Sequence, residues 1–197
     1  MIYYNGNKYG GVFEMNDFFD VLNELGEFTG NVASRDECHK NGYWHRAVYA
    51  FIIDKNFNIL LQKRSKNKKL WPNKWDVTVG GHVNAGEFGR QALIRECKEE
   101  LGIDVKDNEI KYIVGTTSVY NKDGYINNHF DECYLILKDV DVNKLTLQED
   151  EVEEVKYFPC DEIINKINDN YNGLTEKTVS WHILKRLLES NIISKLK

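Results

Sequence analysis

The chain lacks several features that define other classes of protein. Its 197 residues contain no apolar run of membrane-spanning length, no internal repeat and no low-complexity linker. A transmembrane helix needs about 20 consecutive, mainly apolar residues. We therefore expect no membrane partner. The hydrophobic content of 42% is sufficient for one domain with a substantial core.

Paired cysteines and an excess of positive charge are also missing. The cysteines are dispersed along the chain, at Cys38, Cys97, Cys133 and Cys160. Without close pairs, neither a disulfide framework nor a zinc ribbon is indicated, and we expect a cytoplasmic protein. The formal net charge of −5 gives no electrostatic footprint for a nucleic acid polymer.

Proline is scarce as well, with 2 residues, so few breakers interrupt the apolar patterns. These patterns predict strands at 18–24, 28–34, 47–53, 59–63, 75–83, 111–119, 133–137 and 152–158. They predict helices at 88–101, from 159 onward for a short stretch, and at 175–193. In the last helix a core-facing stripe is expected at Val179, Ile183, Leu184, Leu187 and Leu188. This order indicates an α+β fold, an α/β/α sandwich in which a mixed β-sheet lies between helices.

The N-terminal residues 1–14 stand apart because they are polar and have no apolar period. Two interpretations are open: a non-native extension before a true start at Met15, or an arm that packs on the sheet or on a second subunit. The first interpretation rests on the pair Gly10-Gly11, because the codons GGA-GGT shortly before a start codon for Met15 would resemble a ribosome-binding sequence. We expect 15–197 to form a single domain with 15–44 as an N-terminal hairpin extension, through which a homodimer would form.

The segment 81–103 reads GHVNAGEFGRQALIRECKEELGI and carries the strongest chemical signal. If 88–101 is helical, Glu96, Glu99 and Glu100 lie within an arc of about 100°. A solvated helix explains only part of this pattern, since pairing with neighbouring cations contributes a few tenths of a kcal/mol per pair. A strand, a glycine pair and then a three-carboxylate helix are typical of a site for Mg²⁺ or Mn²⁺.

This segment resembles the complete Nudix box. Its specified positions are filled by Gly81, Glu87, Arg95, Glu96, Cys97, Glu99, Glu100, Gly102 and Ile103. The resemblance implies a Nudix fold and an enzyme that hydrolyses a nucleoside diphosphate linked to another moiety, or a related diphosphate. Water would attack phosphorus with the help of divalent metal ions, Mg²⁺ or Mn²⁺.

The resemblance also implies roles for individual residues. Metal ligands would be Glu96, Glu99, Glu100 and the Gly80 carbonyl, while Arg95 would orient Glu87 and the helix carboxylates. Which glutamate accepts the proton from water stays open. The acidic segment 149–154 would supply a further ligand or base, or would simply be a charged strand end.

A second resemblance extends from His45 to Glu87 and is to the isopentenyl diphosphate isomerase branch of the superfamily, with its hydrolase relatives. In that branch, histidines and carboxylates of a later strand hold a metal. The matching positions here are His39, His45, His82, His129 and Asp131. Imidazole ligands suit Zn²⁺ or Mn²⁺. The alternative is that these are ordinary surface or core histidines, as we expect of His182.

One departure from the isomerases affects the predicted reaction. They carry a catalytic cysteine just before the loop Gly-His, where this chain has Gly80. Cys97 occupies the apolar box position, which faces the core, and Cys133 lies on a strand among bulky neighbours. A hydrolase is therefore favoured, with an isomerase-like enzyme or a non-catalytic nucleotide sensor as alternatives.

A basic run at 62–69 is the predicted substrate contact. An ordinary solvated loop is the alternative, but Arg64 and Lys68 match diphosphate-binding residues of the resembling enzymes. Arginine suits bidentate phosphate contacts. Residues 116–128, expected to form a loop, would shape the pocket for a small-molecule substrate. Aromatic side chains that would stack on a base or belong to the core are Trp71, Trp75 and Tyr120.

Overall fold

The computed structural model describes residues 17–122, 124–190 and 193. The arm expected at 1–14 lies outside this part of the chain. The strands are β1 Phe18–Leu22, β2 Phe28–Ser34, β3 His45–Ile53, β4 Asn58–Arg64, β5 Trp75–Asp76, β6 Val79–His82, β7 Ile110–Lys122, β8 Tyr125–Leu137 and β9 Val152–Pro159. The α-helices are α1 Arg35–Asn41, α2 Gly89–Leu101, α3 Cys160–Asn168 and α4 Thr178–Glu189, and short 3₁₀ turns lie at Asp107–Glu109 and Val142–Lys144.

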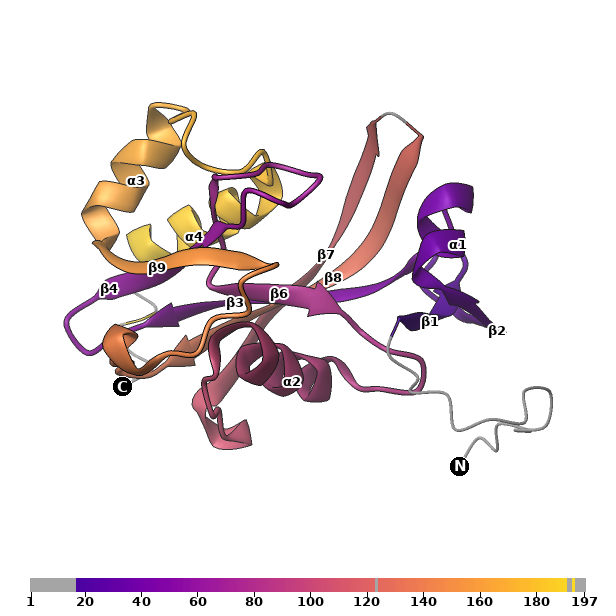
Figure 1. The fold of residues 1–197 in the computed structure, drawn as a ribbon, viewed down its shortest axis with the longest axis horizontal. Helices are drawn as coiled ribbons and strands as arrows, with labels where there is room; N and C mark the ends of the chain where they lie inside the picture. Colours follow the sequence, from indigo (N-terminus) through magenta and orange to yellow (C-terminus); the bar gives the residue numbers. More distant parts are fainter. Residues whose placement is uncertain (1–16, 123, 191–192, 194–197) are drawn as a thin grey trace.

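A seven-stranded mixed sheet forms the centre of the molecule. Its main order is β5-β4-β3-β8-β7, with β6 also paired to β3 and β9 to β4. Strands β3 and β8 run parallel, and their register places His45 opposite His129. Helix α2 lies on one side of the sheet and helices α3 and α4 lie on the other (Figure 1). The predicted α+β sandwich is confirmed.

The alternation of side chains along β3 explains the two cores. Successive strand residues point to opposite faces. Ala50 and Ile52 belong to the cluster covered by α2. Phe51 and Ile53 belong to the cluster covered by α3 and α4. The strand is therefore buried on both faces, which explains its nearly continuous apolar sequence.

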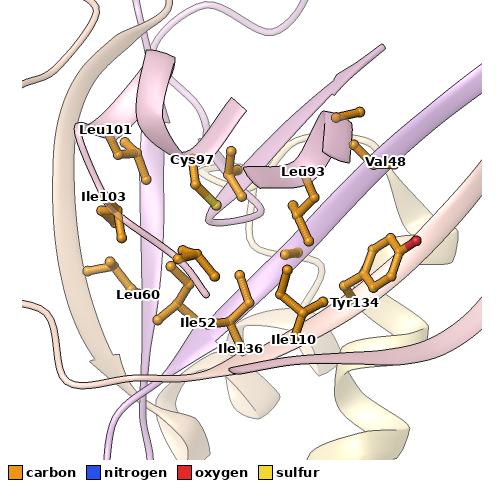
Figure 2. Packing of buried hydrophobic residues seen from close by; sticks show 14 of the residues in the cluster. Val48, Ile52, Leu60, Leu93, Cys97, Leu101, Ile103, Ile110, Tyr134 and Ile136 are labelled. Atoms are coloured by element: carbon orange, nitrogen blue, oxygen red, sulfur yellow. The ribbon is translucent and has the colours of Figure 1, made fainter. Parts of the chain in front are cut away.

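Helix α2 is held on the sheet by an apolar stripe. Figure 2 shows Leu93, Cys97 and Leu101 of the helix together with Ile52 and Ile136 of the strands. All five side chains have an exposed fraction of 0%. Full burial of a large aliphatic side chain contributes about 1.5–3 kcal/mol. The expected core orientation of Cys97 is confirmed, and the stripe fixes which face of α2 carries the carboxylates.

The largest difference from the sequence prediction is in β7 and β8. Of the residues 116–128, expected as a loop, 116–122 lie in β7 and 125–128 in β8, with Ser118 opposite His129 and Tyr120 opposite Asn127. The two strands form a long hairpin that extends beyond the centre of the sheet (Figure 1). The pocket wall that we expected to be a loop is therefore a paired ribbon, and its side chains alternate between its faces.

Three further boundaries differ. The predicted strand 75–83 is divided into β5, which pairs with β4, and β6, which pairs with β3. Helix α1 was not predicted; Ser34 caps it, and its side chain and Glu37 form a reciprocal capping box. The predicted helix 175–193 is α4, and Val179 of the expected core stripe is 41% exposed. The predicted β1–β2 hairpin is present, with antiparallel pairing.

In the described part of the chain, no helix is long and apolar enough to span a membrane.

Candidate functional site

The box carboxylates come from one helix and line one cavity. Glu96, Glu99 and Glu100 belong to α2 and line a cavity of about 640 Å³. Their burial is graded: the side chain of Glu96 is 14% exposed, that of Glu99 49%, and residue Glu100 5%. The helix ends at Gly102, as predicted, with φ 68° and its N–H bonded to Lys98 O. The three carboxylates are therefore buried to different degrees, Glu99 least and Glu100 most.

The close approach of strand and helix requires the glycine at the start of the box. A Cβ atom on Gly81 would lie 2.1 Å from the carboxylate carbon of Glu96. No side-chain carbon is tolerated at that distance, so any larger residue would displace this carboxylate. The first box position thus sets the place of Glu96 through steric exclusion.

Glu100 is the deepest carboxylate of the group. Gln62 Nε2 donates to its Oε2 at 3.2 Å, and the Gly80 backbone N–H also donates to it. Burial, followed by the nearby charges of Glu96 and Glu151, raises the pKa of Glu100 to about 8. The ionised form of this group therefore lacks compensating charge among the described residues. That is the environment expected of a carboxylate that faces a cation.

The guanidinium group of Arg95 forms hydrogen bonds to three carboxylates. Its Nε and Nη2 donate to the two Glu87 oxygens at 3.1 and 3.0 Å, and its Nη1 donates to Glu96 at 2.7 Å and to Glu99 at 3.0 Å. Its Nη2 also donates to His82 O at 2.9 Å. The predicted contact between Arg95 and Glu87 is present. Glu87 does not line the cavity, so its geometry is that of a support for Arg95.

The structure brings four of the predicted histidines together from four separate elements. One ligand atom from each of His39, His45, His82 and His129 lies within 4.8 Å of the others. The elements are α1, β3, β6 and β8. The Nε2 atoms of His45, His82 and His129 are buried and have no hydrogen-bond partner among the described residues. Buried polar nitrogens without partners are rare and costly, and nitrogens gathered in this way could act as metal ligands.

The ionisation of these rings favours free lone pairs. Burial, followed by repulsion from His129, lowers the pKa of His39 to about 4 and that of His45 to about 3. The same causes lower the pKa of His82 well below its ordinary value. Nδ1 of His39 lies 2.8 Å from Arg35 O and Nδ1 of His45 lies 2.8 Å from Tyr43 O. These carbonyls favour the Nδ1–H tautomer. In His45 this leaves Nε2 able to bind a metal, whereas Nε2 of His39 also contacts Asn127 Oδ1.

Asp131 lies beside this cluster rather than within it. Its Oδ1 is 3.6 Å from His129 Nδ1, on the side of the ring opposite Nε2. A carboxylate in that place orients a ligating imidazole. The sequence analysis did not identify Asn127. Its Oδ1 lies 2.9 Å from His39 Nε2, and its Nδ2 lies 3.3 Å from His129 Nδ1.

Two aromatic side chains that the sequence analysis missed enclose the histidines. Phe19 of β1 stacks on His45 and His82, with centroid distances of 5.1 and 4.7 Å. Tyr125 of β8 stacks on His39 at 4.5 Å. These rings cover part of the histidine cluster. Their sequence signal was absent because each looks like an ordinary strand residue.

The predicted substrate residues, Arg64 and Lys68, line the same cavity. Arg64 Nη1 donates to the buried Asp76 at 3.1 Å, and its Nε donates to Leu70 O at 3.0 Å. Lys68 pairs with Glu151. Both cations line the cavity that holds the α2 carboxylates. The same cavity is thus lined by both basic and acidic side chains.

Other predicted residues are divided between the cavity and the core. Of the segment 149–154, Glu151 lines the cavity, while Glu154 pairs with Lys63 at 3.7 Å. Trp71 and Tyr120 line the cavity, with their ring centroids 5.3 Å apart. Trp75 instead packs on Phe158 in the core. His182 is exposed on α4, away from the other histidines.

The fold is a mixed sheet with helices on both faces. A strand with a glycine pair leads into a helix that carries the three carboxylates, and these features together define the class of protein. The NUDIX domain family matches residues 43–178, more than half of the chain. The chain belongs to the Nudix family.

Individual relatives agree with this family. The chain is 40% identical to Nudix hydrolase 3 of Arabidopsis thaliana over 154 residues, which are 76% of this chain and 20% of that protein. It therefore spans about a fifth of that longer relative. It is 34% identical to an uncharacterized Nudix hydrolase of Listeria monocytogenes, covering 74% of this chain and 81% of that one. The expected hydrolase family is confirmed.

Two more distant similarities concern the branch and the fold. The chain is 26% identical to an isopentenyl-diphosphate Delta-isomerase of Escherichia coli, over 72% of this chain and 75% of that one. The crystal structure of DR0079 from Deinococcus radiodurans superimposes with a TM-score of 0.62 at 19% identity, covering 84% of this chain and 96% of that one. The second match supports the fold alone.

Proposed function

We propose that this Nudix protein is a divalent-metal-dependent hydrolase that cleaves the diphosphate linkage of a small molecule. The observation that carries the proposal is one cavity lined both by the carboxylates of Glu96, Glu99 and Glu100 and by the cations of Arg64 and Lys68. A diphosphate binds such a lining when metal ions lie between it and the carboxylates. The substrate would be a nucleoside diphosphate linked to another moiety, or a related diphosphate.

The α2 carboxylates would hold Mg²⁺ or Mn²⁺, together with the Gly80 carbonyl. The residues fit this role because Glu100 is buried, has a pKa raised to about 8 and has two other carboxylates near it. Oxygen ligands of this kind suit hard divalent ions. When bound, such ions lower the pKa of the attacking water and neutralise charge on the phosphate oxygens.

The protein side chains then have distinct tasks. Arg95, held by Glu87, fixes the positions of Glu96 and Glu99. Arg64 and Lys68 bind the phosphate oxygens and thereby place the linkage against the α2 carboxylates. One of these carboxylates, with Glu151 beside it, accepts the proton of the attacking water. Since side chains of opposite charge in one cavity orient the substrate, most of the catalysis on the protein side is positioning and electrostatic stabilisation.

We also propose that the histidine cluster holds a second metal ion. The support is the set of buried Nε2 atoms that have no partner among the described residues. Neutral imidazoles favour Zn²⁺ or Mn²⁺. His39, His45, His82 and His129 would be the ligands, with Asp131 orienting His129 or joining them. The cluster adjoins the cavity through His82 and His129, which line it.

Other expectations from the sequence remain proposals. The cysteines are all free, which is consistent with a cytoplasmic protein. A homodimer through the β1–β2 hairpin is supported by its exposed apolar side chains, Leu25 at 81% and Phe28 at 59%. No nucleic acid polymer and no membrane partner are proposed.

An isopentenyl diphosphate isomerase activity is the second candidate, favoured by the histidine cluster. Against it, Gly80 offers no thiol, and Cys97 and Cys133 are both 0% exposed. Burial also raises the pKa of Cys97 and of Cys133 to about 12, so neither thiol would act as an acid–base group near neutral pH. A nucleotide sensor without catalysis would not require the buried Glu100.

Phosphorus NMR on a substrate panel tests the proposal. We expect the protein with Mg²⁺ or Mn²⁺ to cleave a P–O–P linkage in a panel of nucleotide, nucleotide-sugar, coenzyme A and prenyl diphosphates. Glu100→Gln should lower turnover by at least about 100-fold, because it removes a metal-ligand charge, while the far-ultraviolet circular dichroism stays unchanged. Glu162→Gln, on the exposed face of α3, is the matched control and should retain activity. Equal activity of Glu100→Gln and wild type would contradict the proposed metal site.

A further inference from the structure

Asp76 of β5 joins two cations through a single buried oxygen. Its side chain is 1% exposed, and its Oδ2 accepts from Arg64 Nη1 at 3.1 Å and from Lys177 Nζ at 2.8 Å. Its other oxygen accepts from the Val77 N–H and from Thr175 Oγ1. All hydrogen-bonding directions of the carboxylate are directed at these groups. Asp76 therefore fixes the positions of both cations.

The charges of this group do not balance. Burial alone would raise the pKa of Asp76, but Lys177 and Arg64 reverse this and hold it below its ordinary value, so the group is ionised. One negative charge then faces two positive charges, and Arg64 and Lys177 both line the cavity. Their side chains are 14% and 32% exposed. The excess positive charge is available to an anion that enters the cavity.

An aromatic surface adjoins the cation pair. Lys177 Nζ lies 6.0 Å from the ring centroid of Trp71, and the Tyr120 ring lies 5.3 Å from it at an angle of 62°. Trp71 has φ 49°, a left-handed conformation that is rare for a bulky residue and tends to occur at functional sites. The preceding residue, Leu70, accepts a hydrogen bond from Arg64 Nε. The strained turn thus holds an indole beside the cations.

We propose that Arg64, Lys177, Trp71 and Tyr120 form the subsite that selects the substrate. Arg64 and Lys177 bind the phosphate remote from the α2 carboxylates, and Trp71 with Tyr120 contacts the organic group attached to it. The substrate is accordingly a diphosphate ester whose organic group offers a flat or apolar face, as a nucleobase or a prenyl chain does. Asp76 is a positioning residue for both cations. This inference rests on the proposed function, since it assumes that a diphosphate occupies the cavity.

A purely structural ion pair explains less of the geometry. Such a pair would need one cation for Asp76 and would fasten the segment before α4 to β5, as the contact with Thr175 also does. It would not need a second cation on the same oxygen, nor a strained tryptophan whose ring is half-buried at a cavity wall. The same cavity face therefore has both an anion-binding and an aromatic component.

Isothermal titration with non-hydrolysable diphosphates separates the two components. The probes are methylenediphosphonate, α,β-methylene-ADP and a prenyl methylenediphosphonate, each with Mg²⁺. We expect Lys177→Met to weaken the binding of every probe that wild type binds by about tenfold, because a charge-assisted hydrogen bond to the phosphate is lost. Lys177→Arg should restore most of the affinity. Trp71→Ala should weaken binding of the organic probe that fits the site about tenfold while leaving methylenediphosphonate unchanged.

Matched variants outside the cavity serve as controls. Lys185→Met on α4 and Tyr112→Ala on β7 remove the same kinds of side chain and should leave every affinity unchanged. A nucleotide preference that Trp71→Ala abolishes would assign the organic group as a nucleobase, and a prenyl preference would assign it as a prenyl chain. If methylenediphosphonate binds to wild type and to Lys177→Met equally, or Trp71→Ala changes no affinity, the subsite is wrong. If wild type binds none of the probes, the proposed function itself fails.

Discussion

At the scale of single residues, Glu100 is the carboxylate of the site whose ionisation has the clearest consequence for stability. It is 5% exposed and its pKa is raised to about 8 by burial and by the charges of Glu96 and Glu151. A carboxylate in this state opposes folding when it is ionised without a cation. The protein therefore retains a group that lowers its stability in the absence of metal. We interpret this as a functional constraint, since an apolar residue would fit the same depth without that cost.

This leads to a prediction for the metal-free protein. The pKa of Glu100 is higher in the folded than in the unfolded state, so its contribution to stability is full below about pH 4.5 and is lost as the pH rises to about 8. Between about pH 6.5 and about pH 8.5 the free energy of unfolding should fall on the order of 2 kcal/mol. Chemical denaturation in the presence of a chelator measures this.

The histidines do not obscure that window. Their pKa values are lowered in the folded state, so their contribution is present above about pH 6.5 and is lost only as the pH falls toward about 4. Glu100→Gln should therefore remove the pH dependence above neutrality and leave the acid limb. Saturating Mg²⁺ should do the same in wild type. A wild-type stability that stays constant across the alkaline range would contradict the raised pKa of Glu100.

At the scale of elements, the histidine cluster depends on the register of several segments. The parallel pairing of β3 and β8 sets His45 opposite His129, and β6 brings His82 next to them through its pairing with β3. Helix α1 adds His39, and Asn128 donates to Gly42 O at 2.8 Å, which ties the end of this helix to β8. A shift of one residue in any of these pairings would separate the rings.

We therefore predict that His82→Gln removes one metal ion per chain. Wild-type protein dialysed against Zn²⁺ or Mn²⁺ should retain one more equivalent than the variant, because His82 Nε2 is a buried ligand atom without a partner among the described residues. Any residual affinity should be at least about tenfold weaker. Elemental analysis by mass spectrometry, with circular dichroism to verify folding, measures the difference.

The control for this prediction is His182→Gln. This histidine lies exposed on α4, outside the cluster, so the variant should retain the wild-type metal content. Equal metal content in His82→Gln and wild type would exclude the cluster as a metal site.

Elements with a strong periodic signal could be predicted from the sequence. The box helix α2 begins within one residue of its predicted start, because its apolar stripe and Gly102 mark it clearly. The buried strands β3, β4 and β9 and the two-sided covering of the sheet were also predictable. That the box carboxylates bind metal stays a prediction, although all three line one cavity.

The remaining elements had weaker signals for physical reasons. The ribbon of β7 and β8 is polar along 116–128, so no apolar alternation marked it, although the Asp-Gly pair before Tyr125 is a hairpin signal. Helix α1 has 7 residues and no apolar period; only the Ser34–Glu37 capping box indicated it. Asp76 and Lys177 are far apart in the chain, and only the fold brings them to one contact.

At the scale of the whole molecule, one cavity is lined by residues from both halves of the chain. Its walls come from α2, from β4 with the following turn, from the β7–β8 ribbon and from the segment before α4. The box supplies carboxylates, and residues outside the box supply the cations and aromatic rings. This division explains why the family could be identified from the box while the substrate could not. In our proposal the organic group is selected by residues such as Trp71 and Lys177, which the box pattern does not include.

Hydrolysis in H₂¹⁸O tests the central claim most directly. With the substrate identified from the panel and Mg²⁺ or Mn²⁺ present, the isotope shift in phosphorus NMR locates the oxygen that water supplies. We predict that ¹⁸O appears on a phosphorus atom of one product and that Glu100→Gln abolishes this incorporation. Label on the carbon of the organic product, or double-bond migration without release of phosphate, would contradict attack by water at phosphorus.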